Sequence, residues 1–388
     1  MKKVVLKPGK EKSLLRFHPW IFSGAIAEAP SFSDGDILAL YSHEDIFLGT
    51  GYFHTKNSIA GRMLSFEKKE IEEVLREKLI AAFALRKSLI NMSRTTCFRL
   101  VNAEGDGLSG LIIDQYNDIF VIQISTAGME KLKPLLIKLL VELFIPKGIY
   151  EKSTSSSRAQ EGLEEYSGIL YGEVPREITV MENDIKFLVP LMDGQKTGLF
   201  LDQRSMREKI ASYSFNKRVL NCFSYTGGFS LFALKGGAKE VVSVDSCKKA
   251  SSYAEKNTLL NGFDPSIHKV EESDVFTFLK NDPLNFDLII LDPPAFAKKR
   301  SDVDNACRGY IDLNQRALKK MPPASLLLTC SCSYFIDTAL FQNLISQAAA
   351  LAKRTVKIVE RHTQAIDHPI NLFHPEGEYL KSLLLFVD

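Results

Sequence analysis

The chain contains 388 residues, of which 45% are hydrophobic and 25% charged, and its formal net charge is +2. This length favours two or three domains, and the composition excludes a disordered or fibrous protein. The basic N-terminus lacks the apolar segment of a signal peptide, and no segment has the ~18 apolar residues of a membrane helix, so we expect a cytoplasmic protein without membrane contact.

Residues 1–70 are predicted to form a small β-barrel. The runs "SDGDILALYS", "IFLGTGYFH" and "SIAGRMLSF" are short and punctuated by turn residues, which is typical of β-strands. Residues 1–20 carry six Lys and Arg side chains, among them Arg16, against the single acid Glu11. Such a segment is either an arm that binds phosphates or a solvated tail, and charge alone does not separate the two.

Residues 71–183 are predicted to form an α+β domain. In "EKKEIEEVLREKLIAAFALRKSLI" apolar residues recur at helical intervals with charges on the opposite face, which predicts a helix directly after the barrel. The run "LSGLIIDQYNDIFVIQIS" predicts two strands joined at Asn117 and Asp118. The helical "MEKLKPLLIKLLVELF" and the strand "GIYEKS" follow.

From residue 184 to residue 388, predicted strands and helices alternate, and the strands include "RVLNCF", "EVVSVD", "FDLIILD" and "ASLLLTCS". This alternation is typical of a parallel sheet with helices on both faces. Two C-terminal segments, "VKIVERH" and "YLKSLLLFVD", are expected to pair as edge strands.

Ligands of such sheets bind beyond the carboxyl ends of the strands. After the strand Val219–Phe223, "NCFSYTGGFS" places Gly227 and Gly228 where the backbone can turn tightly and approach a ligand. Asp245 ends the next strand, about 20 residues later, where an acid can accept hydrogen bonds from both ribose hydroxyls. Nicotinamide, flavin and adenosylmethionine domains share this plan, and the missing GxGxxG favours adenosylmethionine, which has no pyrophosphate.

Two further strand ends carry candidate catalytic groups. In "LDPPAF", the two prolines after Asp292 form a rigid turn that directs the acid into the crevice. The strand after it ends in "TCSCSYFI", which contains Cys330 and Cys332. The chain has six cysteines but no CxxC pair and no secretory signal, so we expect reduced thiols and no metal site.

Five segments together resemble the bacterial family of 23S ribosomal RNA cytosine-5 methyltransferases: "NCFSYTGGFSLFAL", "LDPPAFAKKR", "ACRGYIDLN", "SCS" and "QAIDHPI…PEGEYLK". The resemblance covers essentially the whole chain, since "RFHPWIFSGAI" matches the start of a PUA domain and "TGLFLDQR" the entry into the catalytic domain. It implies an α/β fold in which a Rossmann-like class I methyltransferase domain (184–388) follows a β-barrel PUA domain (1–70) and an α+β middle domain (71–183).

The resemblance also implies S-adenosylmethionine as the cofactor. The residues expected around it are Phe223, Ser224, Tyr225, Thr226, Gly227, Gly228, Asp245, Ser246, Asp274, Asp292 and Pro293. The segment "GQKTGLFLDQR", residues 194–204, is expected to cap this site.

By the same resemblance, Cys332 aligns with the family's nucleophile, whose thiolate adds to C6 of cytosine so that C5 can accept a methyl group. Asp292 is the second expected catalytic residue and would stabilise charge at the N3 edge of a base that has left its stack. On a regular strand Cys330 shares a face with Cys332 but lies deeper, so we expect it to pack in the core. Many related enzymes have a second cysteine where this chain has Ala295, so a single cysteine is implied, and the acceptor of the C5 proton stays open between Asp292 and a water.

The expected partner is 23S ribosomal RNA, naked or in a partly assembled large subunit, and the candidate phosphate contacts are Lys298, Lys299, Arg300 and Arg16. The sequence leaves open whether the chain forms a homodimer. A guanine-N7 methyltransferase, a uracil-C5 methyltransferase and a catalytically silent RNA-binding assembly factor remain as alternatives, and a dehydrogenase is the weakest of them. Cys332 argues against the N7 reaction, which needs no nucleophile, and the joint presence of Asp245, Asp292 and Cys332 argues against a silent factor.

Overall fold

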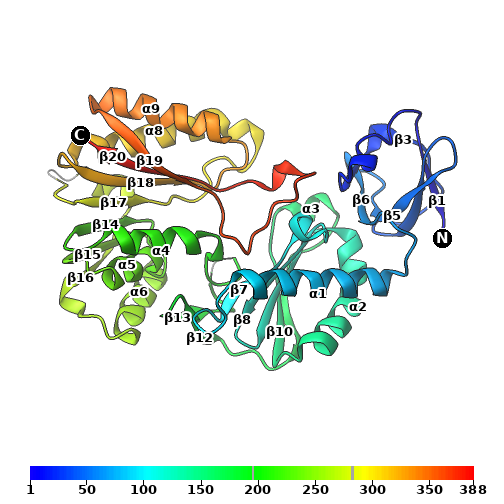
Figure 1. The fold of residues 1–388 in the computed structure, drawn as a ribbon, viewed down its shortest axis with the longest axis horizontal. Coiled ribbons are helices and arrows are strands. Elements are labelled where there is room, and N and C mark those ends of the chain that lie inside the picture. The colour runs from blue at the N-terminus through cyan, green and yellow to red at the C-terminus, as the bar shows by residue number, and fades with distance from the viewer. Residues whose placement is uncertain (195, 281–283) are drawn as a thin grey trace. The chain divides into compact units, whose positions relative to one another are not determined.

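The structure is a computed structural model that describes residues 1–194, 196–280 and 284–388. Its contacts divide the chain into two units, each assembled from several stretches of sequence. Unit 1 comprises Met1–Val180, Val189–Leu201 and Ile366–Gly377, and unit 2 comprises Met181–Leu188, Asp202–Ala365 and Glu378–Asp388. The predicted mixed α/β class is confirmed (Figure 1). The three domain boundaries expected from the sequence stay a prediction.

Unit 1 begins with a six-stranded sheet in the order β2-β6-β5-β4-β1-β3. Its strands are β1 (Lys3–Leu6), β2 (Trp20–Phe22), β3 (Ile26–Glu28), β4 (Ile37–Tyr41), β5 (Phe47–Phe53) and β6 (Ile59–Ser65). Alternate side chains, such as Val4 and Leu6 on β1, point into a common core, as strand geometry requires. Because β1 pairs with both β3 and β4, the backbone of Lys3–Leu6 belongs to the sheet. The six Lys and Arg side chains of residues 1–20 are exposed to solvent.

A five-stranded sheet follows in unit 1, in the order β11-β10-β9-β8-β7. Its strands are β7 (Cys97–Asn102), β8 (Leu111–Tyr116), β9 (Ile119–Ile124), β10 (Gly148–Ser153) and β11 (Tyr166–Gly172), and the helices of this part are α1 (Ile71–Leu89), α2 (Ala127–Phe144) and α3 (Ser157–Gln160). The predicted amphipathic helix is confirmed as α1, whose Leu75, Leu79 and Ala82 pack into one core with side chains of α2 and the sheet. The predicted turn is confirmed between β8 and β9, where Asn117 has a φ of 54°. A separate two-stranded sheet pairs β12 (Glu177–Glu182) with β13 (Ile185–Pro190).

Unit 2 is organised around a seven-stranded sheet in the order β16-β15-β14-β17-β18-β20-β19. Its strands are β14 (Arg218–Cys222), β15 (Glu240–Asp245), β16 (His268–Glu272), β17 (Leu288–Leu291), β18 (Ser325–Ser331), β19 (Val356–His362) and β20 (Lys381–Val387). Strands β14 to β18 are parallel, whereas β20 runs antiparallel to β18 and β19. The expectation of two edge strands is therefore wrong for β20, which lies between β18 and β19 because its apolar side chains are buried on both faces.

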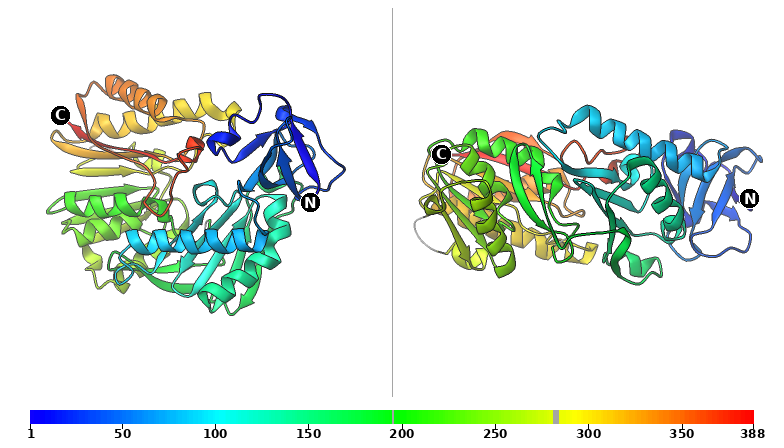
Figure 2. Two further views of the ribbon diagram at one scale, coloured as in Figure 1. Left: turned by 45° about the vertical axis from the view of Figure 1, so that its right-hand side comes forward. Right: turned by 90° about the horizontal axis from the view of Figure 1, so that it is seen from below.

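Helices cover both faces of this sheet, as predicted. They are α4 (Arg204–Tyr213), α5 (Gly228–Lys235), α6 (Lys248–Leu260), α7 (Val275–Phe278), α8 (Val303–Lys320) and α9 (Thr338–Ala352). Figures 1 and 2 show α8 and α9 on one face and α4 and α5 on the other. Successive strand residues point to opposite faces, so that Leu220 packs with α8 and α9 and Val219 with α4 and α5. The near-continuous Val, Ile and Leu runs of these strands follow from this double burial.

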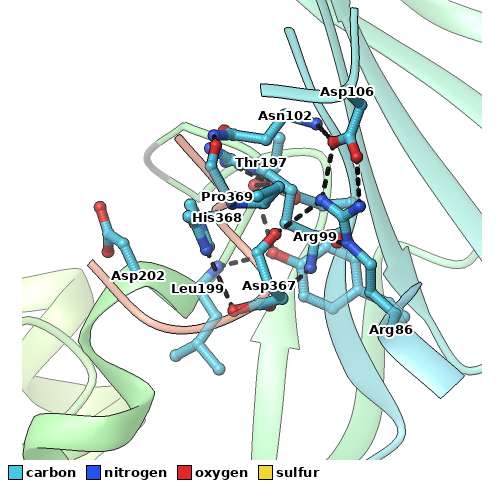
Figure 3. Close-up of polar contacts among 12 residues, drawn as sticks. Arg86, Arg99, Asn102, Asp106, Thr197, Leu199, Asp202, Asp367, His368 and Pro369 are labelled. Atoms are coloured by element: carbon cyan, nitrogen blue, oxygen red, sulfur yellow. Dashed lines mark hydrogen bonds and ion pairs between the residues drawn. The ribbon is translucent and has the colours of Figure 1, made fainter. Parts of the chain in front are cut away.

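A buried arginine joins three parts of unit 1 (Figure 3). Arg86 of α1 is 0% exposed and forms a bidentate ion pair with Asp106, in which Nη2 lies 2.7 Å from Oδ2. It also donates to the carbonyl oxygens of Arg99 and Asp367, each at 2.8 Å. The Asp367 carboxylate accepts a hydrogen bond from the Arg99 backbone amide at 2.8 Å. Because Asp367 belongs to the stretch Ile366–Gly377, Arg86 holds a distant piece of sequence in unit 1.

Replacing Arg86 with alanine is expected to lower the free energy of unfolding by about 3–5 kcal/mol, because the Asp106 carboxylate would lose its cationic partner while staying buried. Urea denaturation followed by circular dichroism measures the change. Arg76→Ala is the matched control on the same helix, since it removes an exposed ion pair with Glu142 and should change stability little. Equal effects of the two substitutions would contradict the importance of the buried pair.

Candidate active site

The parallel strands of unit 2 end at one edge of the sheet. Cys222 of β14 pairs in register with Val244 of β15 and with Leu291 of β17. Leu291 in turn pairs with Thr329 of β18. The chain adds β15 and β16 on one side of β14 and β17 and β18 on the other, so the strand order switches between β14 and β17. Open α/β sheets bind their ligands at such a switch.

The loop from β14 to α5 has an unusual backbone. Phe223, Tyr225 and Gly227 all have positive φ angles, of 58°, 48° and 84°. At Gly227 a Cβ atom would lie 3.0 Å from the Cβ of Ala254, so both conformation and space require glycine there. Left-handed conformations at the two non-glycine residues cost free energy and are concentrated at functional sites.

The carboxylate of Asp245 is fixed next to this loop. It accepts hydrogen bonds from the backbone amides of Tyr225 and Cys247, each at 2.9 Å, and each oxygen keeps acceptor capacity for a ligand hydroxyl. The hydroxyl of Ser224 is buried, and the described part of the chain offers it no hydrogen-bond partner. These two side chains are therefore suited to a polar ligand.

The other predicted cofactor residues lie at the same edge of the sheet but differ in exposure. Thr226 is buried in the loop, and Gly228 is the first residue of α5. Ser246 is exposed directly after β15. Asp274 is also exposed, follows β16, and caps the N-terminus of α7 by accepting a hydrogen bond from the Thr277 amide at 2.8 Å.

Asp292 and Pro293 follow directly after β17, as the sequence predicts. The side-chain amide of Gln203 donates to Oδ1 of Asp292 at 3.0 Å. The preceding residue, Asp202, accepts a hydrogen bond from the Tyr379 hydroxyl at 2.7 Å. Gln203 belongs to the segment expected to cap the site, of which residue 195 lies outside the described residues. The end of that segment thus contacts the predicted catalytic carboxylate.

The two cysteines of "TCSCSYFI" have different environments. The shared face was expected only on a regular strand, and β18 ends at Ser331, so that Cys332 lies beyond it. Cys332 is half-buried, and its Sγ lies 3.9 Å from the Pro293 carbonyl oxygen. Cys330 is 0% exposed and packs with side chains of α4 and α5, which confirms its predicted core position. Burial and, secondarily, the charge of Asp292 raise the pKa of Cys330 well above its usual value.

A tyrosine that the sequence analysis assigned no role holds the backbone around Cys332. The buried Tyr310 of α8 accepts a hydrogen bond from the Ser331 hydroxyl at 2.9 Å, and its oxygen lies 3.0 Å from that of Ser333. The Ser333 hydroxyl also accepts a hydrogen bond from the Ala297 amide at 3.2 Å. Burial raises the pKa of Tyr310 to about 12, so this hydroxyl stays neutral. Tyr310 therefore links the segments that follow β17 and β18.

The predicted RNA contacts fall in both units. Lys298, Lys299 and Arg300 are exposed in unit 2, shortly after the Asp292 turn. Arg16 is exposed in unit 1, at the end of the short 3-10 helix Leu14–Arg16. Among the described residues, no group of three or more His, Cys, Asp or Glu side chains is placed to hold a metal ion. None of the described helices is long and apolar enough to cross a membrane.

Comparison with known proteins decides the family. Residues 4–66 match the profile of a PUA-like domain, and residues 163–384 match that of an S-adenosylmethionine-dependent methyltransferase. The chain is 43% identical over 385 residues to "Ribosomal RNA large subunit methyltransferase I" of Aliivibrio fischeri (strain ATCC 700601 / ES114), with 97% of both chains covered. The chain belongs to this methyltransferase family. Its cofactor is S-adenosylmethionine, as predicted.

Further relatives of the methyltransferase agree with this assignment. The protein of the same name from Vibrio vulnificus (strain CMCP6) is 42% identical over 386 residues and is covered, like the present chain, to 97%. A crystal structure of SMU.776, described as a methyltransferase and complexed with SAH, is 27% identical, covers 100% of both chains and has a TM-score of 0.86. The predicted Rossmann-like domain and N-terminal PUA-like domain are thereby confirmed.

The residues of the methyltransferase at the sheet edge fit this cofactor. Asp245 has two carboxylate oxygens that can each accept a hydrogen bond from a further hydroxyl, and Ser224 has a buried hydroxyl with no partner in the described part of the chain. The short loop without GxGxxG suits a nucleoside that carries no pyrophosphate. Tyr310 was missed by sequence reasoning, although it lies in "ACRGYIDLN", a segment that carries the resemblance.

Iodoacetamide is expected to alkylate Cys332 of the folded methyltransferase at least about tenfold faster than Cys330, because the reactive thiolate of Cys330 is suppressed by burial. Peptide mass spectrometry at timed intervals measures both rates in one sample. Unfolding in urea is the control and should make the two rates similar. Faster labelling of Cys330 than of Cys332 in the folded protein would contradict the difference in their environments.

Proposed function

We propose that this methyltransferase methylates C5 of a cytosine in 23S ribosomal RNA through a covalent adduct between Cys332 and C6 of the base. The observation that carries the proposal is the position of a half-buried thiol beside Pro293, next to the strand end that bears Asp292. The names of the relatives support ribosomal RNA of the large subunit as substrate. Direct transfer to guanine N7 would need no such thiol.

Cytosine C5 is a poor nucleophile until a group adds to C6. In the proposed reaction the Cys332 thiolate forms the Sγ–C6 bond, and the electron pair of the C5–C6 double bond becomes available at C5. The bound cofactor supplies an electrophilic methyl group to C5. Loss of the C5 proton to a base then returns the electron pair, breaks the Sγ–C6 bond and restores the thiolate.

Asp292 is proposed to act on the base and not on the cofactor alone. A protonated carboxyl group at N3 of cytosine donates a hydrogen bond and stabilises the negative charge that develops when the thiolate adds. The hydrogen bond from Gln203 fixes the carboxyl group for this task. The C5 proton is accepted by the Asp292 carboxylate, once its own proton has passed to N3, or by a water. A base in this position has left its stack, as enzymes that modify bases require.

The RNA is proposed to contact both units. The exposed side chains of Lys298, Lys299 and Arg300 provide positive charge shortly after the Asp292 turn, and phosphate contacts of this kind position a substrate. Arg16 provides a further charge in the proposed PUA domain (1–70), which precedes the proposed middle domain (71–183) and methyltransferase domain (184–388).

Cys332→Ala is expected to abolish methyl transfer to 23S ribosomal RNA while leaving adenosylmethionine affinity unchanged, because the thiol takes part in chemistry and not in cofactor binding. Mass spectrometry of nucleosides from naked and partly assembled substrate identifies the product. Cys330→Ala is the matched control and should lose about 1 kcal/mol of stability but little activity. Turnover by the Cys332 variant, or 5-methyluridine or 7-methylguanosine as product, would overturn the proposed reaction.

Asp245→Asn is expected to weaken adenosylmethionine binding by about 30-fold, because the amide replaces one charged acceptor of the ribose hydroxyls and of the backbone amides. Isothermal titration calorimetry measures the affinity. Asp264→Asn is the control. Asp264 also accepts a hydrogen bond from a backbone amide, but it precedes β16 and so lies away from the sheet edge at which the parallel strands end. Unchanged affinity in the Asp245 variant would remove it from the cofactor site.

A further inference from the structure

Lys381 lies beside the proposed nucleophile for a topological reason. It is the first residue of β20, and it pairs in register with Ser331, the last residue of β18. Because β20 is antiparallel to β18, its first residue lies at the edge where the parallel strands end. The neighbouring strand thus starts next to the backbone of Cys332.

The ammonium group of Lys381 is buried at this edge. The residue is 4% exposed, and Nζ donates to the carbonyl oxygens of Ser333 at 2.8 Å and Tyr379 at 2.7 Å. Both acceptors are neutral, and among the described residues no carboxylate lies within ion-pair distance of this nitrogen. An ammonium group has three donors, so one N–H is left for a further acceptor. A buried charge without an anion is costly, and an anion nearby would remove most of that cost.

The titratable groups around Lys381 and Cys332 indicate which anion can pair with the Lys381 ammonium group. Burial lowers the pKa of Lys381 to about 8, and the negative charge of Cys332 opposes this effect more strongly than those of Glu378 and Asp337. Of the other titratable groups that interact with Cys332, Tyr310 on α8 is neutral and Cys330 on β18 is a suppressed thiol. Asp292, after β17, acts on Cys330 when its carboxyl group is ionised.

We propose that Lys381 is a positioning residue that holds Cys332 in the thiolate form. The thiol loses its proton to solvent, and the thiolate that remains is the counter-ion of the buried ammonium group. Two hydrogen bonds to backbone carbonyls fix the ammonium group, and one of these carbonyls belongs to Ser333, the residue after Cys332. The catalytic consequence rests on the proposed function: the thiolate is present before cytosine arrives, and no other base has to activate it.

The test measures the pH dependence of Cys332 alkylation by iodoacetamide, resolved by peptide mass spectrometry, because only the thiolate reacts. In the wild-type protein the midpoint should lie below that of the same cysteine in the urea-unfolded chain, which should be near ~8.5. Lys381→Met should move the midpoint to higher pH by about 1. Lys381→Arg keeps the charge and should leave the midpoint near the wild-type value. Lys357→Met, on the neighbouring β19, removes an exposed lysine and should have no effect.

Either of two results would overturn the role of Lys381. One is a Lys381→Met midpoint equal to that of the wild type; the other is a wild-type midpoint at or above that of the unfolded chain, which decides the question even if the variant does not fold. Methyl transfer by Lys381→Met should be about tenfold slower at pH 7 and recover toward higher pH, since a tenfold smaller thiolate fraction reacts. The alkylation assay contains no RNA and therefore tests the pairing of Lys381 with Cys332 alone. Turnover by the Cys332→Ala variant would instead overturn the proposed reaction and leave that pairing untouched.

Discussion

The hydroxyl of Tyr310 is the point on which the geometry around Cys332 depends. Beyond Ser331 the backbone leaves the sheet, so the ladder of β18 no longer fixes it. Tyr310, which lies on α8 at one face of the sheet, fixes the segment instead through its hydrogen bonds with Ser331 and Ser333. Because buried hydroxyls without partners cost about 1–3 kcal/mol each, the satisfied cluster favours one conformation of the segment. The bond from Ala297 to Ser333 extends it to the segment after β17.

The fold was predictable where local pattern determines it. The period of apolar residues identified α1, and the alternation of strands and helices identified the parallel sheet of unit 2. The place of β20 was not predictable in this way, because strand order is decided by which surfaces remain to be covered. Its run "KSLLLFV" did carry a signal, since continuous apolar runs are typical of strands buried on both faces. No pattern in the sequence indicates that Ile366–Gly377 belongs to unit 1, because its place depends on hydrogen bonds such as that from Arg86 to Asp367.

The candidate site divides in the same way. Asp245, Asp292 and Cys332 were predictable as candidates because each lies at or directly after the end of a strand, and the ends of parallel strands meet at one edge. Tyr310 and Lys381 were not, because each reaches the site from an element whose position is settled only by tertiary packing. Both do lie in segments that carried the family resemblance. The sequence therefore pointed to the proposed site residues before it pointed to the groups that support them.

Desolvation explains why two cysteines separated by one residue differ so much. At Cys330 the surroundings are apolar side chains from α4, α5 and the sheet, and the charge of Asp292 adds to the penalty on a thiolate. At Cys332, the first residue beyond the strand, partial exposure reduces that penalty, and the proposed pairing with the Lys381 ammonium group would oppose it further. The carboxyl group of Asp292, the thiol of Cys332 and the ammonium group of Lys381 thus lie at the same edge of the sheet. Such a pairing of opposite electrostatic environments within a few residues is what separates a reactive thiol from an inert one.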